Sequence, residues 1–143
     1  MPDLAGHLGT WEGSWSTFLD PNQPYDEAPV KATISHDGDV LVIGYEGSIA
    51  GDFVTGIIRW SENDRTTTVD WVDSWHTNGQ HEYLAGYDGE PPSYEYNGDD
   101  PWVWDITIET SDSGVTVTHH NAGPGAGVPR YVGVSMKLET RTS

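Results

Sequence analysis

One stretch of the chain, residues 71–87, places two tryptophans, two tyrosines, two histidines and one aspartate around the pair Asn78-Gly79. Carboxylates and imidazoles are common general acids and bases in enzymes. Tryptophan and tyrosine rings, which combine a large apolar surface with a polar tip, often line small-molecule sites. The stretch therefore indicates either a ligand-binding wall or an acid–base pair, and the choice depends on which side chains share a face.

Two strands are expected here, over residues 65–76 and 80–88. The loop between them decides the faces, because a one-residue change of register turns a strand over. A two-residue turn at residues 78–79 would pair His76 with His81 and would place both tryptophans beside carboxylates. That register divides the aromatic side chains between the two faces.

A three-residue loop from Thr77 to Gly79, with a left-handed Gly79 at a bulge, is the alternative. It pairs Trp75 with His81 and separates inward from outward residues more cleanly, so we adopt it. The predicted inward face then consists of Trp71, Asp73, Trp75, His81, Tyr83, Ala85 and Tyr87. The predicted outward face carries Asp70, Ser74, His76, Glu82, Gly86 and Asp88.

In this register Asp73 lies among aromatic rings, where a carboxylate must be hydrogen-bonded or its pKa must rise. One interpretation is a polar staple that locks the structure. The other is a pocket acid, base or ligand acceptor. As an enzyme, the protein would use Asp73 as base and His81 or Tyr83 as acid, in the manner of an isomerase, cyclase or lyase.

Two later segments each add one residue to the predicted ligand-binding wall. Residues 101–110 alternate between apolar and polar side chains, which puts Trp104 on the inward face. Residues 114–121 alternate in the same way and end their inward row with His119, near a barrel mouth. The adjacent His119 and His120 point to opposite faces of a strand, so no metal site is predicted.

The elements that must position these residues are strands, because period-2 segments rich in Val, Ile, Thr, Trp and Tyr recur and no useful helical period appears. We expect strands near residues 9–18, 29–37, 39–48, 51–61, 65–76, 80–88, 101–110, 114–121 and 129–140. Consecutive antiparallel strands joined by short loops lose their exposed edges when they close. The sequence predicts one all-β domain over residues 1–143, an antiparallel up-and-down barrel of about 8–10 strands.

The connections are predicted from turn residues. Asp37-Gly38 and Ser113-Gly114 suit tight hairpins. The prolines of residues 89–93 are expected to interrupt pairing, since proline has no N–H to donate. Residues 121–129 are expected to form a flexible glycine-rich loop, and residues 1–8 a short helical turn with Leu4 and Leu8 pointing inward.

The first predicted strand opens with Gly9-Thr-Trp-Glu-Gly-Ser-Trp15. Its Gly-x-Trp, just after a short turn, resembles the signature of calycins, the lipocalins and fatty-acid-binding proteins. Together with Trp-Val-Asp-Ser at residues 71–74, it makes the chain similar to the uncharacterised bacterial lipocalin-like families of DUF1579 type. That resemblance implies a calycin barrel with Lys137 or Arg141 lying over Trp11 in a cation–π contact, and it implies no activity.

The segment Gly9-Thr-Trp-Glu-Gly13 also resembles the opening of nitrobindin-like haem proteins. That resemblance implies a haem held by a histidine toward the C-terminal end, for which His119 and His120 are the nearest candidates. Residues 14–18 depart from the pattern of those proteins. Haem binding is therefore kept only as a second alternative.

The chain is strongly acidic, with 23 Asp and Glu against 6 Lys and Arg, and its net charge is −17. Such a surface repels nucleic acid and anionic lipid, so neither is an expected partner. The scattered acids suit a very soluble protein or one adapted to high salt, where cations screen the repulsion. No cysteine, no long apolar run and no signal-peptide pattern appear, so a cytoplasmic monomer or homodimer is expected.

The leading prediction is a small-molecule-binding barrel that holds an apolar or aromatic ligand in its cavity. Seven Trp and seven Tyr against two Phe favour amphipathic stacking walls. The alternatives are the enzyme and the haem protein described above. The predicted lining is Trp71, Asp73, Trp75, His81, Tyr83, Tyr87, Trp104 and His119.

Overall fold

The computed structural model describes residues 4–143, which form ten antiparallel strands closed into a barrel. The strands are β1 (Gly9–Thr17), β2 (Asp26–Asp37), β3 (Val40–Ile49), β4 (Asp52–Asn63), β5 (Thr66–Asp73), β6 (Glu82–Tyr87), β7 (Ser93–Tyr96), β8 (Trp102–Ser111), β9 (Gly114–Gly123) and β10 (Val128–Arg141). Each strand pairs with its neighbours in sequence, and β10 pairs with β1. The predicted all-β, up-and-down barrel is confirmed.

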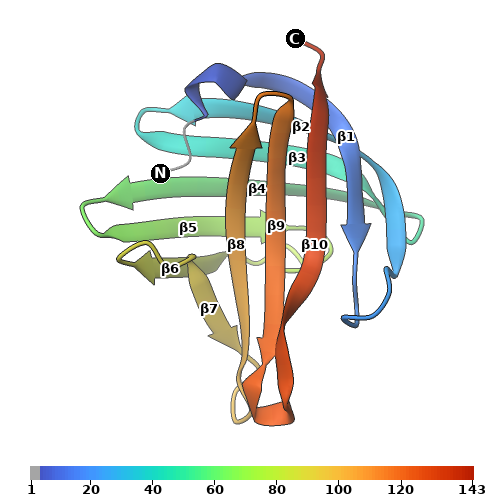
Figure 1. The fold of residues 1–143 in the computed structure, drawn as a ribbon, viewed down its shortest axis with the longest axis vertical. Helices are drawn as coiled ribbons and strands as arrows, with labels where there is room; N and C mark the ends of the chain where they lie inside the picture. The colour runs from blue at the N-terminus through green and yellow to red at the C-terminus, as the bar shows by residue number, and fades with distance from the viewer. Residues whose placement is uncertain (1–3) are drawn as a thin grey trace.

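The barrel is flattened into two crossed layers (Figure 1). Strands β2 to β5 run across the direction of β8 to β10, and β1 lies at the junction between the layers. The other junction is β6 and β7, which are joined only at the pair Ala85 and Ser93. Because every strand reverses direction, the loops after β1, β3, β5, β7 and β9 all lie at one end of the barrel.

The interior is a packed core produced by the alternation of side chains along each strand. Along β3, for example, Leu41, Ile43 and Tyr45 are buried and their neighbours are less so. Hollows of about 340 to 520 Å³ open on the outer wall, and one of about 250 Å³ lies where residues 89–92 cover an end of the barrel. None of these hollows is lined by His119, which lies in the interior.

Most predicted strand boundaries agree with the structure to within three residues, and two expectations are wrong. The segment Ser93–Tyr96 forms β7, which pairs along its whole length with β8. Residues 121–129 are not a flexible loop, because β9 continues to Gly123 and a 3-10 turn, η2 (Pro124–Ala126), leads into β10.

The N-terminal segment forms the other 3-10 turn, η1 (Ala5–His7), just before β1. Leu4 is buried as expected, whereas Leu8 is exposed and its predicted inward orientation is wrong. The expected cation over Trp11 is Arg141, whose guanidinium carbon lies 5.1 Å from the ring centroid. The part of the predicted turn at residues 1–3 lies outside the described residues.

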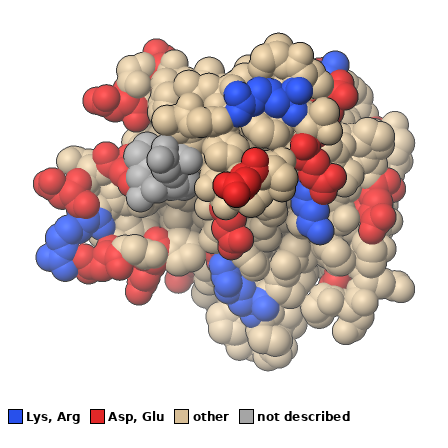
Figure 2. All heavy atoms as spheres, turned by 45° about the horizontal axis from the view of Figure 1, so that its top comes forward, with Lys and Arg blue, Asp and Glu red and all other residues tan. Residues whose placement is uncertain are grey.

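On the face shown in Figure 2, acidic side chains are spread and do not gather into one patch, in keeping with the net charge of −17. Basic groups lie among them on this face. Within residues 4–143, no helix has the length and apolar character needed to cross a membrane.

Candidate functional site

The hairpin of β5 and β6 takes neither of the two registers considered from the sequence. Trp71 pairs with Glu82 and Asp70 pairs with Tyr83, so residues 74–81 form a longer connection than predicted. Gly79 is left-handed, with φ at 78°, as a turn at that point requires. The turn was therefore located correctly, but the strands stop before they reach it.

The strands stop early because the side chain of Asp73 binds the backbone that follows it. Its Oδ1 accepts hydrogen bonds from the backbone N–H groups of Trp75 (3.0 Å), His76 (2.5 Å) and Thr77 (3.0 Å). The Thr77 hydroxyl donates to the Asp73 carbonyl at 2.9 Å and accepts from the Asp73 N–H at 2.9 Å. Side chains that bind the local backbone in this way compete with strand pairing.

This change of register corrects four predicted inward residues, of which Ala85 shares the outer face of β6 with Tyr83 and Tyr87. Tyr83 is 71 % exposed and Tyr87 is 58 % exposed, so both point to the outside of the barrel. His81 is also exposed, and its Nδ1 lies 2.7 Å from a carboxylate oxygen of Asp70 on the outer surface. The predicted acid–base pair of Asp73 with His81 or Tyr83 is therefore not assembled.

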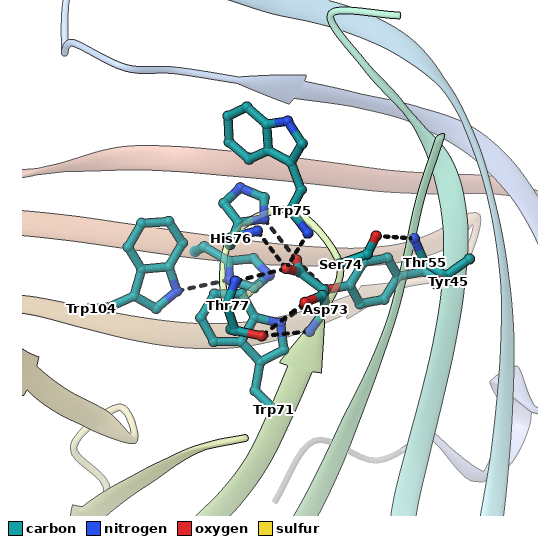
Figure 3. Close-up of polar contacts among 10 residues, drawn as sticks. Tyr45, Thr55, Trp71, Asp73, Ser74, Trp75, His76, Thr77 and Trp104 are labelled. Carbon is teal, nitrogen blue, oxygen red and sulfur yellow. Dashed lines mark hydrogen bonds and ion pairs between the residues drawn. The ribbon is translucent and has the colours of Figure 1, made fainter. Parts of the chain in front are cut away.

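Asp73 is buried as predicted, and its partner is a histidine that the adopted register placed outside. Nδ1 of His76 lies 2.7 Å from Asp73 Oδ2, which also accepts a hydrogen bond from the Tyr45 hydroxyl at 3.0 Å (Figure 3). The Trp71 indole N–H donates to that Tyr45 hydroxyl at 2.9 Å. Strands β3 and β5 and the loop after β5 thus build one buried polar cluster.

The cluster keeps Asp73 ionised. Burial alone opposes the charge, but the hydrogen bond from His76, together with those from the Thr77 backbone and Tyr45, lowers the pKa of Asp73 to about 2. Burial and the neighbouring carboxylate raise the pKa of Tyr45 well above its usual range, so its hydroxyl remains a donor. The arrangement is a carboxylate whose two oxygens accept from five donors.

One atom of the cluster has no partner. Nε2 of His76 is buried and makes no hydrogen bond with any described residue. The His76 side chain as a whole is 11 % exposed. Buried polar atoms are normally paired, so an unpaired imidazole nitrogen beside an ionised carboxylate marks this histidine as the candidate functional residue.

A second histidine lies beside the first, on β9. His119 is buried as predicted, and its Nδ1 accepts a hydrogen bond from the Trp104 indole N–H at 3.0 Å. Burial, with the His76 ring acting in the same direction, lowers the pKa of His119 to about 3. The ring is therefore neutral, and the ring centroids of His76 and His119 are 6.2 Å apart.

Half-buried aromatic side chains extend from this cluster toward the barrel end that carries the loop after β5. The Trp71 and Trp104 rings stack with centroids 5.5 Å apart and planes within 10°. Tyr96 donates to the Asn121 amide oxygen at 2.7 Å. We define the aromatic end as the half-buried Trp75, Tyr94, Tyr96, Trp102, Trp104 and Tyr131.

Several members of the site were not among the predicted site residues: Tyr45, His76 and Asn121, and Tyr94, Tyr96, Trp102 and Tyr131 of the aromatic end. Tyr45 and Asn121 lie on strands far in sequence from the hairpin, and no local pattern connects them to it. For His76 a signal does exist. Asp73 followed by Thr77 is a sequence that favours side-chain capping of a turn over continued pairing.

The residues around the candidate haem histidines do not fit a haem. His119 is 2 % exposed, and the ring centroids of Trp71 and Trp104 lie 4.9 and 5.5 Å from its own. A porphyrin beside this imidazole would have to displace those rings. His120 lies on the outer side of the barrel wall, next to Asp105.

The comparisons with known proteins do not assign the chain to a family. No family matches its sequence, and no curated protein matches it either. The similarity to lipocalin-like families therefore stays a prediction, and the case for function rests on the site itself.

Proposed function

We propose that the protein binds a neutral, planar aromatic molecule at the aromatic end of the barrel. The proposal is supported by the half-buried rings of Trp75, Tyr94 and Trp104, which lie over the polar cluster of Asp73 and His76. Aromatic walls with a few convergent polar groups are the usual composition of small-molecule sites. Since the core behind the cluster is packed, the ligand lies at the end of the barrel and not in its centre.

The charges near the site favour an uncharged ligand. Asp73 is ionised at neutral pH, and burial together with the nearby Glu82 raises the pKa of Tyr94. The net charge of −17 adds a long-range repulsion for anions. Free fatty acids and other carboxylates are therefore disfavoured as ligands. The absence of cysteine favours a cytoplasmic setting for this activity.

The observation that carries the proposal is the concentration of incompletely buried rings at one barrel end. Large aromatic side chains on a monomer surface are normally scattered, and a contiguous group indicates a binding site. Here the group includes the Trp71 and Trp104 stack, which continues from the half-buried rings into the core. A flat ligand would extend that stack toward solvent.

Equilibrium dialysis against 2-methoxynaphthalene, an uncharged planar probe, tests the proposal. We expect saturable binding at one site, weakened about fivefold or more in Tyr94→Ala through loss of ring contact. Phe53→Ser is the matched control, because Phe53 is 70 % exposed on the outer wall. Absence of saturable binding, or an equal loss in both variants, would contradict the proposal.

A further inference from the structure

We infer that the ligand of the aromatic end carries a hydrogen-bond donor, a hydroxyl or a neutral N–H, which it gives to Nε2 of His76. The inference rests on the proposed function and adds the ligand's chemical class, which is an uncharged aromatic alcohol or N–H heterocycle. It follows from the protonation pattern of the buried cluster, from the donors already in use there, and from the position of Trp75.

In the neutral form of His76, the contact with Asp73 makes Nε2 the acceptor nitrogen. A carboxylate only accepts hydrogen bonds, so the contact of 2.7 Å between Asp73 Oδ2 and His76 Nδ1 requires the proton to be on Nδ1. In a neutral imidazole the other nitrogen then carries a lone pair. Asp73 therefore both fixes the tautomer of His76 and orients its ring, leaving Nε2 free to accept.

Three neighbouring donors of the protein are already used. The Trp71 indole N–H donates to Tyr45, and the Trp104 indole N–H donates to His119. The Tyr45 hydroxyl donates to Asp73. No described residue donates to Nε2 of His76. A buried acceptor without a partner is unfavourable, and a ligand donor would satisfy this one.

Trp75 provides the route to this atom. Its ring contacts the His76 ring edge-on, with centroids 4.9 Å apart, and it is only partly buried. The backbone of Trp75 is held by Asp73 Oδ1, so the indole can move by rotation about its own side-chain bonds while the loop keeps its shape. Displacing this indole uncovers Nε2, and an aromatic ligand can replace the ring contact that Trp75 gives up.

Two probes that differ only in a donor test the inference. 2-Naphthol carries a hydroxyl, and 2-methoxynaphthalene has the same ring with the hydrogen replaced by a methyl group. At pH 7.5 we expect the protein to bind 2-naphthol about five- to tenfold more tightly. His76→Phe should bind both probes equally, and His36→Phe, at an exposed position on β2, should keep the preference.

The outcomes separate the two proposals. Equal affinity for both probes in the unaltered protein would overturn the donor inference and leave the binding site standing. Binding of neither probe would overturn the proposed function itself.

A second measurement covers the case in which His76→Phe does not fold. The ¹⁵N resonance of His76 Nε2 in the unaltered protein should shift on titration with 2-naphthol, because its lone pair becomes hydrogen-bonded. It should not shift comparably with 2-methoxynaphthalene. Equal responses to the two probes would overturn the inference.

Discussion

Two of the Asp–His pairs among the described residues, Asp73 with His76 inside the barrel and Asp105 with His120 on its outer wall, are built differently. Inside, Asp73 Oδ2 lies 2.7 Å from His76 Nδ1. The other partners of the Asp73 carboxylate are backbone N–H groups and a tyrosine hydroxyl. Outside, Asp105 on β8 lies 3.1 Å from Nδ1 of His120 on β9. Both carboxylates are nearly buried, at 2 % and 7 % exposure.

The outer pair is balanced by an arginine. Arg130 on β10 donates to both carboxylate oxygens of Asp105, from Nε at 2.7 Å and from Nη2 at 2.9 Å. Such two-point contacts are among the strongest side-chain hydrogen bonds. The outer set therefore connects three neighbouring strands, and its arginine is still 48 % exposed to water.

The difference separates structure from function. Arg130 neutralises the charge of Asp105 in the outer pair and contacts solvent, which suits a link between neighbouring strands. Among the described residues, the inner pair has no arginine or lysine partner, and Nε2 of His76 is unpaired beneath half-buried rings. If Asp73 only held the loop after β5 in place, the ring of His76 would not need to be oriented in this way.

The largest expected effect is the difference in stability between a variant of Asp73 and a variant of Asp105. Asp73→Ala leaves several buried donors without an acceptor and should lower the free energy of unfolding by about 3–5 kcal/mol. Asp105→Ala should cost about 1–3 kcal/mol, since water can hydrate the exposed side of Arg130. Denaturant unfolding of both variants measures the difference, and equal losses would contradict the comparison.

The next largest expected effect is a loss of folding stability at low pH. His119 has a folded-state pKa of about 3, below the ordinary histidine value, so the unfolded chain binds a proton that the folded chain does not. Stability should therefore fall as pH decreases from about 6 toward 3, by up to about 1.4 kcal/mol per pH unit from this group.

The His119→Phe variant isolates this dependence, because other groups titrate in both proteins. The difference in unfolding free energy between the two proteins should change between pH 7 and pH 4, whereas His36→Phe should leave the profile unchanged. Parallel profiles for His119→Phe and the unaltered protein would show that His119 is not held neutral.

Asp73 should contribute at still lower pH. Its folded-state pKa of about 2 lies below the ordinary value, so its stabilising effect is present above about pH 4. The effect is lost as pH falls through about 2, and its full size is about 2 kcal/mol. Acid unfolding of Asp73→Asn should lack this component, and an unchanged acid limb would contradict the assignment.

The smallest effect tests the outward face of β6. Tyr83→Ser removes a ring that is 71 % exposed and should change the free energy of unfolding by no more than about 0.5 kcal/mol. It should also leave the affinity for 2-methoxynaphthalene unchanged. A clear loss of affinity would place the ligand on the outer wall and not at the aromatic end.

Much of the fold could be predicted because the barrel follows local rules. Alternation between apolar and polar residues locates most strands and places Trp71, Trp104 and His119 inside. The short β7 was missed because four residues after two prolines show too few repeats of the pattern.

The site could be predicted only in part, because its geometry depends on one local competition. Asp73 was expected inside and is inside, but its capping of residues 75–77 ends β5 and reverses the orientation of Tyr83 and Tyr87. The same capping brings His76 into the barrel. Tyr45 joins from β3, a contact that no spacing within the hairpin reveals.

The most direct test of the account compares the two histidines in one binding experiment. The dissociation constant of 2-naphthol is measured for His76→Phe and for His120→Phe, which alter the inner and the outer Asp–His pair in the same way. The account predicts that binding weakens about five- to tenfold in His76→Phe and does not change in His120→Phe. Equal affinity in the two variants would contradict it.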